Sequence, residues 1–203
     1  MDILQVLQQV DENLFLTINR DGNVPVLNPV MLLFRNAITW IPLYLFVLLW
    51  SFFKFKERFI PFVVLSIITF AVSDFTSASI LKPAFLRPRP CYNPALIDVM
   101  NLLTGCGGVN SMPSSHATNH FALATFWFWS IYITTGKKWR WLWLWAAVIC
   151  YAQVYVGKHY PFDVLVGAFY GLVIGTVAAK IFEKPTLPFR KNNNTFIQTN
   201  TTT

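Results

Sequence analysis

Three short polar runs carry most of the side chains in this sequence that could do acid–base or nucleophilic chemistry. They are residues 82–90, 113–116 and 153–163, and each adjoins a long apolar segment. Ionisable groups are costly beside lipid, so one that persists there usually has a partner or a function. The runs therefore mark a candidate active site, provided that the fold brings them together.

The first run has the chemistry of an anion-binding segment. Lys82, Arg87 and Arg89 supply positive charge, and an arginine can make two parallel hydrogen bonds to an oxyanion. A phosphoryl group in transfer spreads negative charge over three oxygens, so its site needs several fixed cations and donors. The run is suited to holding a phosphate.

The second and third runs add groups for acid–base and nucleophilic steps. Ser114 and Ser115 open an apolar helix whose first N–H groups favour a phosphate, and His116 beside them could protonate a leaving oxygen. His159 and Asp163 are four residues apart, so on a helical turn the carboxylate can hold one ring nitrogen while the other attacks phosphorus. Each feature alone is weak, and a hydrogen bond inside a helix bundle is the alternative for each. Together they predict hydrolysis of a phosphate ester.

Composition indicates the setting of this site. Of the 203 residues 55% are hydrophobic and 12% are charged, whereas charged residues make up about 25% of a soluble domain. We expect an integral membrane protein. The net charge of +7 is spread over short loops, which argues against a nucleic-acid partner, and the acidic N-terminus argues against a cleaved signal peptide.

The predicted fold is all-α, an integral membrane bundle of about five transmembrane helices. Residues 3–18 are predicted to form an amphipathic helix at the membrane surface. Residues 1–184 are expected to form one membrane-embedded phosphatase domain, and the polar tail 185–203 is expected to be disordered. The expected spans are 37–53, 60–81, 116–134, 141–156 and 162–182.

Five spans place successive loops on alternate sides of the membrane. Ten of the sixteen Lys and Arg residues then share one side, namely Lys54, Lys56, Arg58, Lys137, Lys138, Arg140, Lys180, Lys184, Arg190 and Lys191. Positively charged loops favour the cytoplasm. The three polar runs are therefore predicted to lie together on the extracytoplasmic side, in a bacterial inner membrane with the active site facing the periplasm or exterior.

Several polar residues allow two interpretations. Cys91 and Cys106 share one loop and form either a disulfide or two free thiols. Asp74 either supports Lys82 or makes a hydrogen bond inside the bundle. His120, four residues after His116, either joins a zinc site or lies in the core, and the glutamate of a zinc-binding His-Glu motif is absent.

The three runs resemble the motifs of the type 2 phosphatidic acid phosphatase superfamily, membrane lipid phosphatases related to vanadium haloperoxidases. The motifs are Lys-x6-Arg-Pro, Pro-Ser-Gly-His and Ser-Arg-x5-His-x3-Asp. Lys82 and Arg89-Pro90 match the first in full. The second is matched except that Ser115 replaces glycine, and the third except that Ala152-Gln153 replaces Ser-Arg.

This resemblance implies metal-independent hydrolysis without a cofactor. His159 would attack the phosphate to give a phosphohistidine, Asp163 would orient it, and His116 would protonate the leaving group and then activate water. The phosphate oxygens would be held by Lys82, Arg89, Ser114 and the amides of the helix start.

Gln153 is the departure with the largest expected effect. A neutral donor in place of an arginine removes roughly 1 to 3 kcal/mol of charge-assisted hydrogen bonding. Either Arg87 or Lys158 compensates, or the substrate has one contact fewer, or activity is reduced or lost.

The expected substrate is a phosphorylated lipid in the bilayer. Undecaprenyl pyrophosphate is favoured because three cations in residues 82–89 could hold a diphosphate, and phosphatidylglycerol phosphate, phosphatidic acid and lipid A phosphates are alternatives. A vanadate-dependent peroxidase is disfavoured because those relatives are generally soluble. A catalytically impaired protein that binds or transports phospholipid is the alternative of another class, and the oligomeric state is left open.

Overall fold

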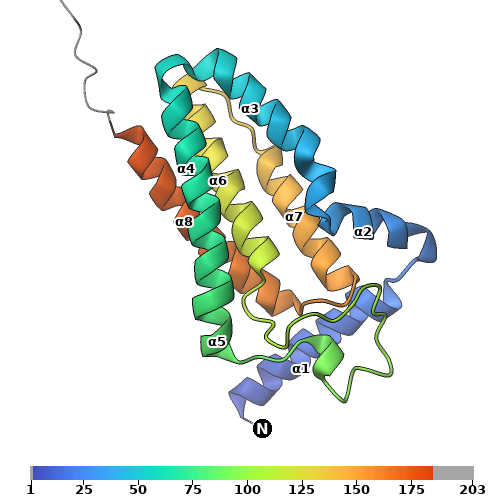
Figure 1. The fold of residues 1–203 in the computed structure, drawn as a ribbon. Helices are drawn as coiled ribbons and strands as arrows, with labels where there is room; N and C mark the ends of the chain where they lie inside the picture. The colour runs from blue at the N-terminus through green and yellow to red at the C-terminus, as the bar shows by residue number, and fades with distance from the viewer. Residues whose placement is uncertain (1, 185–203) are drawn as a thin grey trace, which may run out of the picture.

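The structure is a computed structural model that describes residues 2–184, and the predicted tail 185–203 lies outside the described residues. Its α-helices pack into an elongated bundle with one helix across its end (Figure 1). The helices are α1 (Ile3–Leu16), α2 (Asn28–Arg35), α3 (Ile41–Phe55), α4 (Phe59–Phe75), α5 (Lys82–Phe85), α6 (Ser115–Thr135), α7 (Trp141–Tyr155) and α8 (Pro161–Glu183).

The expected spans correspond to α3, α4, α6, α7 and α8, with ends within a few residues of the prediction. By length and apolar composition, two helical stretches in the described chain, Ala37–Phe85 and Pro161–Glu183, are long enough to cross a membrane. The first turns back at Lys56, which has a φ of 50°, so α3 and α4 run in opposite directions (Figure 1). Their outward side chains are apolar and exposed, such as Phe53 and Ile67, as lipid-facing surfaces require.

Helix α6 is the centre of the bundle. It packs against α4, α7 and α8, and its contact with α8 is close because α8 presents glycines at four-residue spacing. A Cβ atom on Gly171 would lie 2.4 Å from the Thr118 carbonyl oxygen, and one on Gly175 would lie 2.4 Å from that of Ala122. Small residues let two membrane helices approach backbone to backbone. This contact fixes the start of α6 against the start of α8.

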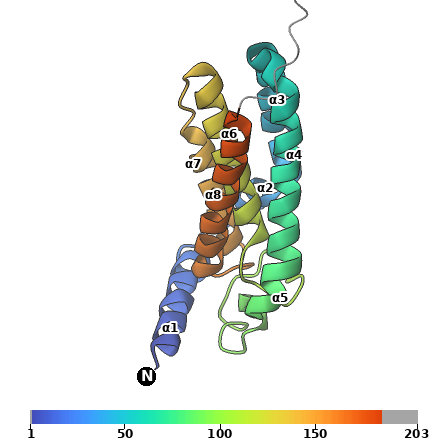
Figure 2. The same ribbon diagram turned by 90° about the vertical axis from the view of Figure 1, so that its left-hand side faces the viewer.

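Helix α1 lies across the end of the bundle where α6 and α8 begin, as both views show (Figures 1 and 2). Ile3, Leu4 and Leu7 are exposed on it, whereas Phe15 and the acidic Asp11 are fully buried. The predicted helix is therefore present, and its place at a membrane surface stays a prediction.

The long loop between α5 and α6 closes the same end. Cys91 and Cys106 form a disulfide with a Cα–Cα distance of 6.0 Å, as the first of the two interpretations expected. An antiparallel bridge joins Pro88 to Asn110. The loop therefore carries its basic residues on a cross-linked frame.

Candidate active site

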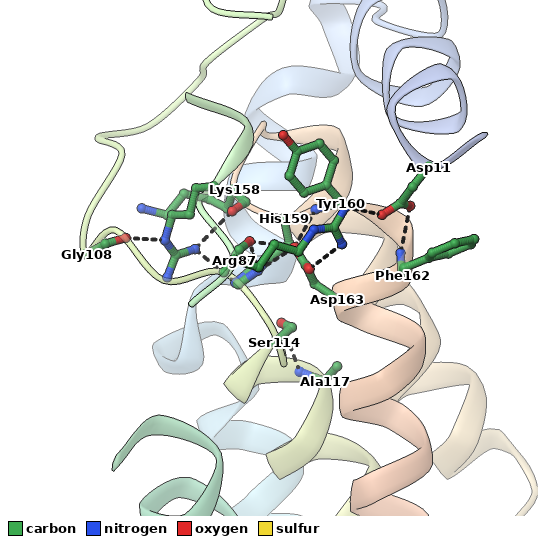
Figure 3. Close-up of polar contacts among 12 residues, drawn as sticks. Asp11, Arg87, Gly108, Ser114, Ala117, Lys158, His159, Tyr160, Phe162 and Asp163 are labelled. Atoms are coloured by element: carbon green, nitrogen blue, oxygen red, sulfur yellow. Dashed lines mark hydrogen bonds and ion pairs between the residues drawn. The ribbon is translucent and has the colours of Figure 1, made fainter. Parts of the chain in front are cut away.

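The three polar runs meet where α6 and α8 begin (Figure 3). The Ser114 backbone N–H donates to the carbonyl of Asp163 at 2.9 Å, which joins the second run to the third. The Ser111 N–H donates to the Arg87 carbonyl at 2.7 Å, which joins the first run to the loop before α6. Segments that lie far apart in the sequence therefore form one cluster.

His159 and Asp163 form the expected pair, but not on a helical turn. His159 precedes α8, and Tyr160 is extended at its N-cap with φ −73° and ψ 157°. Asp163 in the first turn reaches back, so that its Oδ2 accepts the Tyr160 N–H at 2.8 Å and lies 3.5 Å from His159 Nδ1. Asp163 is fully buried and His159 is 3% exposed. The four-residue spacing therefore brings the two side chains together because Asp163 caps the start of α8, not because both residues lie on one helical turn.

Ser111 is a member of this cluster that the sequence did not indicate. Its hydroxyl donates to Asp163 Oδ2 and lies 3.2 Å from His159 Nδ1. It belongs to no motif and is a serine in a serine-rich stretch, so only the folded loop identifies it. Its hydroxyl therefore contacts both the carboxylate and the imidazole of the pair.

Arg89 determines which nitrogen of His159 carries the proton. Its Nη1 lies 3.0 Å from His159 Nε2 and 2.9 Å from the Lys158 carbonyl, and its Nε donates to the Gly108 carbonyl. A guanidinium only donates, so Nε2 must accept and Nδ1 carries the hydrogen on the side of Asp163. The lone pair is therefore on Nε2, where it accepts the Arg89 hydrogen bond in this structure.

The surroundings of His159 favour its neutral form. Burial, together with the charges of Arg89 and Lys82, lowers its pKa to about 4, although the hydrogen bond and the charge of Asp163 act in the opposite direction. A neutral imidazole keeps its lone pair and can act as a nucleophile. Lys82 is the first residue of α5, and its charge acts on His159 in the same direction as that of Arg89.

Arg87 is bound differently from the expectation that it would hold substrate. Its Nη1 donates to Asp163 Oδ1 at 2.8 Å and its Nη2 to Asp11 Oδ2 at 2.6 Å. Its guanidinium lies 4.2 Å from the centre of the Tyr160 ring. Both terminal nitrogens thus serve carboxylates of the protein.

Asp11 is the other residue that the sequence analysis missed. It lies on α1 with both carboxylate oxygens bound, to Arg87 and to the Phe162 N–H. A signal was present, since Asp11 falls on the same helical stripe as Leu4, Leu7, Phe15 and Ile18. An acidic residue on an apolar stripe is expected to have a buried partner.

His116 lies in the first turn of α6, directly beside the N–H groups that the helix leaves without intrahelical acceptors. Its ring stacks on that of His120, with centroids 6.2 Å apart. His120 is buried, with Nδ1 2.8 Å from the His116 carbonyl and its ring against Trp145. Within residues 2–184 no group of three or more His, Cys, Asp or Glu side chains could hold a metal ion.

Ser114 caps α6, and Ser115 is its first residue. The Ser114 hydroxyl accepts the Ala117 N–H at 3.5 Å (Figure 3), so this side chain is engaged with the helix start. Asp74 accepts the Asn119 side-chain N–H at 2.8 Å, which is the hydrogen bond inside the bundle that the sequence left open. Among the described ion pairs none joins Asp74 to Lys82.

Two donors beside the site have no partner among the described residues. Gln153 is 1% exposed on α7 and its Nε2 is unpaired, as is the buried Nε of Arg35 on α2. Arg35 Nη1 reaches Thr104 in the long loop at 3.3 Å, and α2 packs on α7. Lys158, expected as a possible substitute for the arginine, has its Nζ on the carbonyls of Gly105 and Cys106.

A buried histidine beside a carboxylate, a second histidine at a helix start and a basic loop are the groups that hydrolysis of a phosphate ester would need. Residues 62–187 match the PAP2 superfamily. The chain belongs to this superfamily and is a membrane lipid phosphatase.

Two relatives of known activity are similar in sequence, and two solved structures are similar in fold. A lipid A 4′-phosphatase of Porphyromonas gingivalis is 30% identical, over 88% of this chain and 75% of the relative. One from Bacteroides thetaiotaomicron is 31% identical, over 83% and 75%. The crystal structure of a PAP2-type phosphatidylglycerolphosphate phosphatase from Bacillus subtilis has a TM-score of 0.71 at 21% identity, over 91% of this chain and 90% of that one. That of Aquifex aeolicus LpxE has a TM-score of 0.60 at 27% identity, over 84% and 95%.

Proposed function

We propose that this protein hydrolyses a phosphomonoester of a lipid A-type glycolipid through a phosphohistidine on His159. The observation that carries the proposal is the position of His159, with Nε2 against Arg89 and Nδ1 against Asp163. The substrate class is taken from the two lipid A 4′-phosphatases, each about 30% identical to this chain.

The expectation of undecaprenyl pyrophosphate depended on three cations for two phosphates. Arg87 donates both terminal nitrogens to carboxylates, which leaves Lys82 and Arg89 in that segment for the substrate. This segment therefore offers two cations instead of the three on which the diphosphate expectation rested. The monoester is therefore the better-supported substrate.

In the first step His159 Nε2 attacks phosphorus as the bond to the leaving oxygen breaks, and His116 gives that oxygen a proton. Asp163 stabilises the positive charge that develops on the His159 ring, as in other nucleophile–orienter pairs. In the second step His116 removes a proton from water, the water attacks phosphorus, and the P–N bond breaks. Lys82, Arg89 and the free amides at the start of α6 would hold the phosphate oxygens.

Gln153 is neutral and cannot by itself replace the charged hydrogen bond of the motif arginine, but Arg35 nearby also has a donor that is unpaired among the described residues. In this proposal Gln153 Nε2 donates to one phosphate oxygen and Arg35 contributes the charge that the motif arginine gives elsewhere. Burial and, after it, the charges of Arg89 and Arg35 lower the pKa of Lys158 to about 8, which agrees with a concentration of positive charge at this end of α2. Arg87 and Lys158, the substitutes first considered, are bound to protein oxygens.

Phosphate release from a lipid A bisphosphate by the purified full chain in detergent tests the function. The wild type should turn over in EDTA, and acid quench should trap an acid-labile phosphoenzyme. His159→Ala should abolish both signals, and His116→Ala should lower turnover by at least about 100-fold, the size expected of a general acid. Wild-type rate in either variant, with melting unchanged, would refute the assigned role.

A further inference from the structure

The fully buried carboxylate of Asp11 connects the N-terminal helix to the catalytic pair. Its Oδ2 accepts Arg87 Nη2 at 2.6 Å, and its Oδ1 accepts the Phe162 N–H at 2.9 Å in the first turn of α8. Arg87 in turn binds Asp163 Oδ1 at 2.8 Å. One guanidinium therefore joins a carboxylate on α1 to the carboxylate that faces His159 (Figure 3).

This arrangement assigns the two oxygens of Asp163 to different partners. Arg87 binds Oδ1, while Oδ2 receives the Tyr160 N–H and the Ser111 hydroxyl and faces His159. An arginine beside one carboxylate prefers to bind both oxygens at once. Asp11 opposes that preference by holding the second nitrogen of Arg87, so Oδ2 stays directed at the imidazole.

We propose that Asp11 is a positioning residue, which acts through Arg87 to keep Asp163 Oδ2 on His159, so that helix α1 completes the active site. The inference rests on the proposed function. Without the Asp11 charge, Arg87 rotates to bind both Asp163 oxygens, and the developing imidazolium loses its counter-ion. The first chemical step then slows, while substrate binding by the cations is little changed.

A merely structural role for Asp11, as an anchor for α1, predicts a different result. Asp11→Asn keeps an oxygen that can accept the Phe162 N–H and removes the charge that holds Arg87. Glu12→Gln is the matched control, because Glu12 is the next residue on α1 and loses the same charge. Glu12 binds Asn93 in the long loop at 2.8 Å and does not contact Arg87.

The test uses the full-length chain in detergent with a lipid A bisphosphate and, separately, with orthovanadate, which becomes five-coordinate on a nucleophilic imidazole and so imitates the transition state rather than the bound substrate. Asp11→Asn should lower kcat by about 10- to 100-fold with KM within about twofold, the pattern of a contact made in the transition state. It should also weaken orthovanadate binding at least tenfold, whereas Glu12→Gln should change neither. In an Arg87→Met background Asp11→Asn should add little, because the two residues act in one chain of contacts.

The inference would be overturned if Asp11→Asn and Glu12→Gln changed kcat and orthovanadate binding equally. It would also be overturned if the fold-losses in kcat of Asp11→Asn and Arg87→Met multiplied in the double variant. Failure of the wild type both to release phosphate and to bind orthovanadate would instead refute the proposed function. Melting temperatures of all variants identify any loss of folding. The two failures are therefore distinguishable.

Discussion

At the scale of single residues, position 153 is where the proposed phosphate site departs most from the motif. Gln153 stands where the third motif has arginine, and its Nε2 is buried and unpaired. A buried donor without a partner costs free energy in the free protein. Substrate binding can recover that cost, because a phosphate oxygen is an acceptor. Arg35, whose Nε is also unpaired, can bring the charge from α2.

We predict that Arg35→Gln lowers kcat/KM by about 10- to 100-fold, the loss of one charged hydrogen bond of roughly 1.5 to 3 kcal/mol. Gln153→Arg in that background should restore most of the activity, because it returns a cation to the same phosphate. Steady-state phosphate release measures both. Thr104→Val is the control, since it removes the side-chain partner of Arg35 without its charge. No recovery in the double variant would show that Arg35 and position 153 serve different groups.

The sequence could indicate a candidate site residue where that residue belongs to a motif or to a recognisable spacing. Motif and spacing indicated His159, Asp163 and Arg89, which the structure brings into contact. They also indicated His116 and Lys82, whose roles stay predictions. Asp11 and Ser111 were not indicated, because their roles depend on contacts between segments distant in the sequence. Arg87 was expected to bind substrate, since nothing in a basic run shows that two carboxylates take its nitrogens.

At the scale of the elements, the contact between α6 and α8 positions the chemistry. The glycines of α8 let its backbone approach that of α6, and the Ser114–Asp163 hydrogen bond lies at the end of this contact. The five main helices were predictable from apolar runs bounded by charged turns. The path of residues 86–114 was not, because it depends on the disulfide and on contacts with the loop after α7.

Gly171→Ala should destabilise the protein, although alanine normally favours a helix over glycine by up to about 1 kcal/mol. Its Cβ would lie 2.4 Å from the Thr118 carbonyl oxygen and 2.9 Å from the Ala122 nitrogen, both backbone atoms. Overpacking costs roughly 1 to 3 kcal/mol. Thermal unfolding in detergent should show a lower midpoint together with lower activity. Gly105→Ala, where nothing lies within 4 Å, should leave both unchanged, and a stabilised Gly171→Ala would contradict the packing described here.

At the scale of the whole molecule, the candidate site and the basic turns that lie outside it are at opposite ends. The basic turns around Lys56 and Lys138 lie at the end away from α1, whereas the disulfide and the candidate site lie at the end that α1 covers (Figures 1 and 2). Positive loops favour the cytoplasm, and disulfides persist in oxidising compartments. Two independent properties therefore predict the same orientation, with the site outside.

Single cysteines and a membrane-impermeant maleimide test this orientation. Val99→Cys, an exposed position in the long loop, should be labelled in intact cells from which any outer membrane has been removed. Lys137→Cys, in the turn between α6 and α7, should be labelled only in inverted vesicles. The wild type should stay unlabelled in both, because Cys150 is buried and Cys91 is bonded to Cys106. The opposite pattern would place the site in the cytoplasm, and the disulfide would then face a reducing compartment in which such bonds rarely persist.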